Sequence, residues 1–70
     1  MPSQLEARIV VTRGRRADLM AEIAVWEPAC DKLTKMGTAG PTEAMIEHRI
    51  REMKKQFERR GHRVSVLERR

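Results

Sequence analysis

The sequence predicts a small α+β domain with the element order β-α-α-β. In this fold, two helices form an antiparallel hairpin and the two terminal segments pair as a short two-stranded ribbon. Three observations lead to this prediction. Apolar residues alternate near both ends of the chain, apolar residues recur at helical spacing between them, and residues 37–41 carry the glycines and proline of a turn.

Residues 5–12 are expected to form the first strand. Apolar side chains occupy every second position there: Leu5, Ala7, Ile9 and Val11. The β-branched residues at 9–12 strengthen the prediction, because such side chains are enriched in strands. Gly14 then interrupts any helical continuation, since glycine in a helix costs about 1 kcal/mol relative to alanine.

Residues 16–36 are expected to form the first helix. Its apolar seam advances in steps of four and three: Leu19, Ile23, Trp26, Cys30 and Leu33. Pro28 lies inside this segment and removes a backbone hydrogen bond, which indicates a kink near that residue. Gly37 can end the helix in a left-handed conformation. The spacing therefore places Trp26 and Cys30 in the core.

Residues 42–60 are expected to form the second helix, and residues 62–68 the second strand. The helical stripe is Ile46, Ile50, Met53 and Phe57. A short turn between two helices favours antiparallel packing, which brings Gly14 and Gly61 to the same open end. The two strands leaving that end are expected to pair antiparallel. The alternative is an all-α helical hairpin, because the helical spacing can be continued through both terminal segments.

Length and composition suit one small domain that needs further stabilisation. The 70 residues carry a net charge of +5 and a single cysteine, Cys30, so no disulfide can form within the chain. Domains of this size are marginally stable alone, and we therefore expect a homodimer. The lone cysteine and the absence of a long apolar run predict a cytoplasmic protein without a membrane contact.

No arrangement typical of an enzyme is present in the sequence. A nucleophile needs a base and an orienting group nearby, and Cys30, His48 and His62 are widely separated. The same three residues do not have the spacing of a zinc site. We therefore expect no enzymatic activity, no metal and no cofactor.

The arginines near residue 14 are the most informative charges. Arg13, Arg15 and Arg16 lie at the expected start of the first helix, where the helix dipole disfavours positive charge. A bound phosphate would remove this conflict by contacting the guanidinium groups and the free helix N–H groups. A solvated loop paired with Asp18 and Glu22 is the alternative.

These features predict a small basic protein that binds nucleic acid through its phosphates, acting as a regulatory or accessory factor of a bacterium or phage. The alternative is a protein-interaction module, such as an inhibitor, assembly factor or structural subunit, that docks its basic end on an acidic protein surface. The predicted nucleic-acid contacts are Arg13, Arg15, Arg16, Arg59, Arg60 and Arg63, flanked by Arg49, Lys54 and Lys55.

Overall fold

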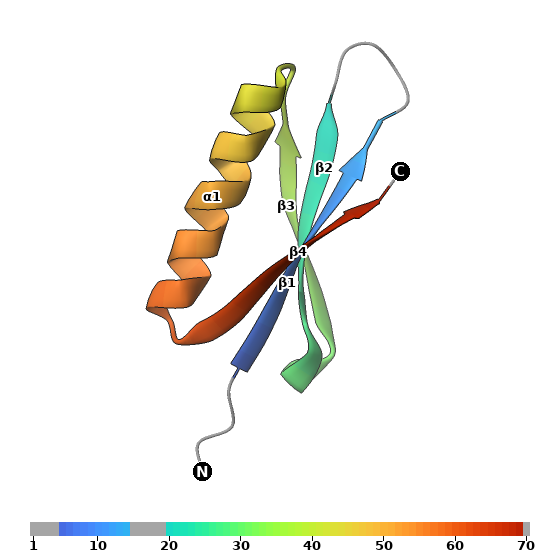
Figure 1. Cartoon of the computed structure of the whole chain (residues 1–70). Helices are drawn as coiled ribbons and strands as arrows, with labels where there is room; N and C mark the ends of the chain where they lie inside the picture. The colour runs from blue at the N-terminus through green and yellow to red at the C-terminus, as the bar shows by residue number, and fades with distance from the viewer. Residues whose placement is uncertain (1–4, 15–19, 70) are drawn as a thin grey trace.

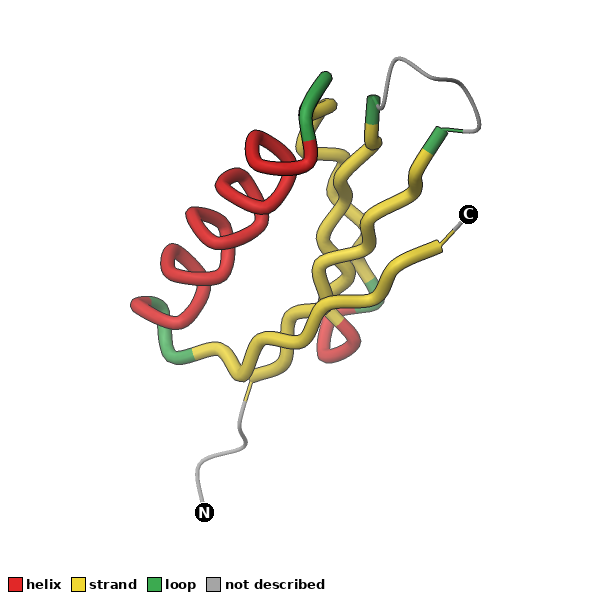
Figure 2. The backbone as a smooth tube through the Cα atoms, turned by 45° about the horizontal axis from the view of Figure 1, so that its top comes forward, coloured by secondary structure: helices red, strands yellow, loops and turns green. Residues whose placement is uncertain are grey.

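A computed structural model of the chain describes residues 5–14 and 20–69. Within these residues, a mixed four-stranded sheet carries one α-helix on one face (Figures 1 and 2). The elements in chain order are β1 (Leu5–Arg13), β2 (Ala21–Glu27), the 3-10 turn η1 (Pro28–Cys30), β3 (Lys32–Ala39), α1 (Glu43–Arg59) and β4 (His62–Arg69). The predicted β-α-α-β fold with a helical hairpin is therefore wrong, and so is its all-α alternative.

The strands are ordered β3-β2-β1-β4. β1 to β3 form an antiparallel meander, whereas β4 runs parallel to β1, with Leu5 opposite His62 and Thr12 opposite Arg69. The antiparallel ribbon expected from the two terminal segments is thus incorrect. The reason is the length of α1: its 17 residues span about 25 Å, as far as an eight-residue strand. The helix returns the chain to the end of the sheet where β1 begins.

Residues 21–39 form two strands instead of the predicted helix over residues 16–36. In β2, Ala21, Ile23 and Val25 are buried while the residues between them are more exposed. This two-residue period competes in the sequence with the helical spacing, and packing against α1 selects the strand. Pro28 is the first residue of the turn η1. Proline is tolerated there because an N–H at the first position of a helical turn makes no hydrogen bond within the turn.

A β-bulge in β3 adjusts which side chains face the helix. The β2–β3 register shifts between Ile23 and Ala24, opposite Met36 and Gly37. Gly37 has φ +100, a conformation that L side chains rarely adopt. The extra residue lets both Met36 and Ala39 pack against the core.

The core lies between α1 and one face of β1 and β2. It consists of Ala7, Ile9, Val11, Ala21, Ile23, Val25, Ile46, Met53 and Phe57. The buried residues of α1 belong to the apolar stripe expected from the sequence, with Ile50 half-buried beside them. Thr42 caps the helix by accepting a hydrogen bond from the Met45 N–H at 3.3 Å.

Candidate functional site

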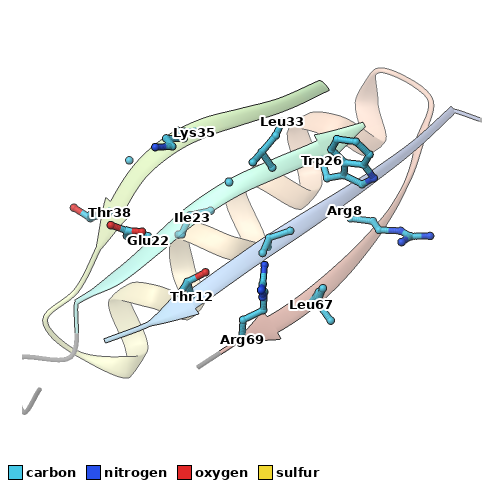
Figure 3. A pocket seen from close by; sticks show the side chains of 13 residues that line it. Arg8, Thr12, Glu22, Ile23, Trp26, Leu33, Lys35, Thr38, Leu67 and Arg69 are labelled. Carbon is cyan, nitrogen blue, oxygen red and sulfur yellow. The ribbon is translucent and has the colours of Figure 1, made fainter. Parts of the chain in front are cut away.

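The face of the sheet opposite α1 is not covered by any described part of the chain. Figure 3 views this face with α1 behind the sheet. A hollow of about 490 Å³ lies along it and is lined by residues of all four strands. Alternation and register assign the following residues to this surface, called the open face: Glu6, Arg8, Val10, Thr12, Glu22, Ala24, Trp26, Leu33, Lys35, Thr38, Arg63, Ser65, Leu67 and Arg69.

The centre of the open face is apolar and includes the single tryptophan of the chain. Trp26 is half-buried and lies directly across from Arg8 on β1 and from Leu33 on β3. Leu33 and Leu67 remain 55% and 51% exposed. Trp26 was expected in the core, but its position on β2 points it away from α1 because its neighbour Val25 faces the core.

Cations surround this apolar centre. Arg8, Lys35 and Arg69 line the hollow, and each comes from a different strand (Figure 3). Glu22 is the acidic residue that lines it. Within residues 5–14 and 20–69, none of these three cations forms an ion pair with a carboxylate. Their charges are therefore available to a bound anion.

Arg13 is held by carboxylates of the same chain. Its Nη1 lies 2.5 Å from Glu43 Oε1, and its Nη2 lies 2.7 Å from Glu68 Oε1. The hydrogen bond to Glu68, together with the charges of both carboxylates, raises the pKa of Arg13. This guanidinium joins the end of β1 to the start of α1 and the end of β4, and both of its Nη atoms are engaged by these carboxylates.

The other predicted arginines do not gather beside Arg13. Arg63 is opposite Glu6 near the start of β1, about 23 Å along the strand from Arg13. Arg59 and Arg60 lie at the end of α1, which is near the start of β1. The guanidinium carbon of Arg60 lies over the Phe57 ring, 5.4 Å from its centroid. Arg15 and Arg16 lie outside the described residues. The two terminal strands do pair, but they run parallel, so Arg13 and Arg63 lie at opposite ends of the strand pair and not at one shared end.

Three further predicted contacts lie on α1. The helix exposes all three of them, Arg49, Lys54 and Lys55, in the layer opposite the open face. Arg49 donates a hydrogen bond from Nη2 to the carbonyl oxygen of Met36 at 3.3 Å. These charges therefore belong to a different surface from Arg8, Lys35 and Arg69.

Cysteine and histidine side chains do not form a reactive cluster in the described part of the chain. The helical spacing had placed Cys30 in the core, but Cys30 is exposed in η1. His62 Nε2 lies 3.6 Å from Glu27 Oε1, and its ring meets Phe57 edge-on. His48 is paired with Glu52 on the helix surface at 3.8 Å. Across residues 5–14 and 20–69, no three His, Cys, Asp or Glu side chains are placed to hold a metal ion.

The sequence prediction missed Arg8, Lys35 and Arg69 because their shared face depends on the order in which the four strands pair, and β2 and β3 had been assigned to a helix. The signal for β2 was present in "AEIAVWE", where small or branched apolar residues alternate with Glu22, Ala24 and Trp26. Assigning this segment as a strand would have placed Trp26 on the face opposite Ile23 and Val25. Pairing of β2 with β1 and β3 then places Arg8 and Lys35 on the same face as Trp26.

The chain matches no family model, no curated protein and no solved structure. None of the described helices has the length and apolar character needed to cross a membrane.

Proposed function

We propose that the open face binds single-stranded nucleic acid, with Trp26 stacking on a base and Arg8, Lys35 and Arg69 contacting phosphates. The observation that carries this proposal is the position of Trp26, in an uncovered apolar centre with Arg8 directly across from it. Aromatic side chains on sheet surfaces bind bases by stacking, and surrounding cations follow the backbone. The overall charge of +5 favours the same partner.

The shape of the open face favours a single strand over a duplex. Four strands span about 14 Å between the outer two, before side chains are added. This is wider than the roughly 12 Å major groove of B-DNA, which admits a helix or a two-stranded ribbon. An unpaired strand can lie across the sheet and present a base to the indole. Recognition through one stacked base and phosphate contacts gives little sequence readout.

The exposed thiol of Cys30 suits a reducing compartment, and we place this activity in the cytoplasm as that of an accessory or regulatory factor. Arg15 and Arg16 follow β1 in the chain after Gly14 and are retained as additional phosphate contacts within the proposal. The α1 cations Lys54 and Lys55 are not part of the proposed interface. They provide a matched control because they carry the same charge on the other layer.

The test is titration of labelled single-stranded DNA and RNA oligonucleotides from about 50 to 200 mM salt. Binding is expected to quench the fluorescence of Trp26, the single tryptophan. Trp26→Ala is expected to weaken binding by about 5- to 150-fold, the effect of losing one stacked base. Arg8→Ala with Lys35→Ala is expected to reduce the salt slope by about 1.4, since each phosphate contact on a single strand contributes about 0.7.

The control variant Lys54→Ala with Lys55→Ala removes the same charge from α1 and is expected to leave the slope unchanged. An equal loss in both double variants would contradict a specific site on the open face. Absence of binding at the lowest salt would overturn nucleic-acid binding altogether.

A second candidate function is docking of an acidic protein on the same face. The exposed side chains of Leu33 and Leu67 favour it, because large apolar residues beside an aromatic centre are typical of protein interfaces. Failure of every oligonucleotide to bind, combined with partner capture that is abolished by Trp26→Ala, would support this alternative.

A further inference from the structure

The two edges of the sheet differ in how they discourage pairing with another strand. β3 carries a bulge at Met36 and Gly37 and two lysines, Lys32 and Lys35. Bulges and edge lysines are devices that natural sheets use to prevent edge-to-edge association. β4 has no proline, no lysine and no register shift along its pairing with β1. The β4 edge is thus the one suited to accept a further strand.

Apolar side chains are exposed on both sides of the β4 edge. Val66 faces the helix side but remains 44% exposed, and Leu67 faces the open side at 51%. Val64 is half-buried beside Val66. The central "VSVL" of this strand is therefore a mainly apolar edge without a covering element among the described residues.

We propose that β4 pairs antiparallel with β4 of a second copy of this chain, centred on Ser65, to give a continuous eight-stranded sheet. This proposal does not depend on nucleic-acid binding. Its geometry follows from symmetry: a two-fold axis perpendicular to the sheet makes edge strands antiparallel and keeps both helices on the same side. Residues that face each other across the axis must then point to the same face, so the axis passes beside a residue and not between two.

The residues of β4 pair favourably when the axis passes beside Ser65. With the axis at Ser65, Val64 faces Val66 of the second copy, and His62 faces Glu68 of the second copy, each pair occurring twice. Arg63 faces Leu67 of the second copy and can cover it with its aliphatic stem. No like charges face each other in this register.

The neighbouring register is less favourable. With the axis at Val66, Arg63 faces Arg69 of the second copy and Val64 faces Glu68 of the second copy. Like charges directly opposite each other on neighbouring strands are destabilising, whereas aliphatic and opposite-charge pairs are stabilising. The pairing pattern therefore favours Ser65 over Val66 as the centre.

This arrangement joins the two open faces into one surface. Both copies present Trp26 and Arg8 on the same side, because the axis keeps each helix behind the sheet. A strand of nucleic acid or a protein partner could then contact both copies. If the open face has another function, the edge pairing stands unchanged.

Register-specific crosslinking tests the proposal. In a Cys30→Ser background, Ser65→Cys places two thiols directly opposite each other at the axis, within reach of a disulfide after mild oxidation. Leu67→Cys is the matched control, since it lies two residues farther along and faces Arg63 of the second copy. We expect a covalent dimer with Ser65→Cys and little with Leu67→Cys. Equal or greater crosslinking with Leu67→Cys would overturn the Ser65 register.

Mass measurement of the unmodified chain gives an independent test. Light scattering after size exclusion is expected to give twice the 8.1 kDa chain mass as concentration rises. Ser65→Lys puts two lysines against each other at the axis and is expected to return the chain to the monomer, whereas Thr38→Lys on the β3 edge is expected to leave the dimer intact. Far-UV circular dichroism checks that both variants fold. A monomer at all concentrations, or loss of the dimer with Thr38→Lys, would overturn the proposal.

Discussion

The two faces of the sheet are built from alternating residues of the same strands, yet they differ in burial and in charge. On the face covered by α1, β1 and β2 place Ala7, Ile9, Val11, Ala21, Ile23 and Val25, each no more than 2% exposed. On the open face the intervening positions include Arg8, Glu22 and Trp26. The covered face holds the fold together, while the open face is free to carry charge and an aromatic ring at little expense to stability.

The largest loss of stability is expected from removing a side chain that is buried on the covered face. Ile23→Ala is expected to reduce the free energy of unfolding by about 2–5 kcal/mol, because it loses burial and leaves a cavity between β2 and α1. Urea denaturation followed by circular dichroism measures this. Leu67→Ala on the open face is the matched control, and its effect is expected to be below about 1 kcal/mol because the side chain is 51% exposed. Equal losses would contradict the assignment of the two faces.

A smaller effect is expected at the bulge that sets which β3 residues face the helix. Gly37→Ala is expected to lower the free energy of unfolding by about 1–3 kcal/mol through backbone strain at φ +100, since no described residue beyond its two chain neighbours has an atom within 4 Å of the added methyl group. Gly37→Asn is expected to lose less, because asparagine tolerates positive φ better than alanine. The same urea measurement tests both variants, and an Ala variant as stable as the parent would show that the bulge can rearrange freely.

The smallest loss of stability is expected from removing a surface charge. Arg13, which is paired with carboxylates, and Arg8 on the open face are compared. Arg13→Gln removes the link among β1, α1 and β4 and is expected to lower the urea midpoint slightly at low salt. The difference is expected to shrink at high salt, because exposed ion pairs are screened. Arg8→Gln on the open face, which forms no ion pair with a described carboxylate, is expected to leave the midpoint unchanged. A larger loss from Arg8→Gln would reverse the roles assigned to these two arginines.

Local signals identified three of the elements close to their observed bounds. The alternation over residues 5–12 corresponds to β1, and that over residues 62–68 corresponds to β4. The stripe and turn residues around 42–60 correspond to α1, with Thr42 as its cap. In α1 the helical period dominates and the flanking Pro41 and Gly61 agree with it. In the two terminal segments the alternation competed with a continued helical spacing, and Gly14 and Gly61 favoured the strands.

Residues 21–39 and the candidate site could not be obtained in the same way. The spacing of Ile23, Trp26, Cys30 and Leu33 fits one helical seam. In the structure, Ile23 is in the core, Trp26 and Leu33 are on the open face, and Cys30 is in an exposed turn. Pro28 suited a kinked helix as well as a turn between strands. The candidate site moved from an arginine-rich end to the open face because Trp26 and Lys35 lie on strands and pair into the same sheet as Arg8.

From the sequence alone, α1 was located to within one residue at each end, because its apolar stripe and the flanking Pro41 and Gly61 act within a few residues. The same local signals favoured strands in the two terminal segments but left a helical continuation open. Only the tertiary structure decided that residues 21–39 are strands, that β4 runs parallel to β1, and that Arg13 is held by Glu43 and Glu68. The physical reason is that two periodicities competed in that middle segment. Burial of Ala21, Ile23 and Val25 against Ile46, Met53 and Phe57 favoured one of them, and contacts so distant in sequence leave no local signal.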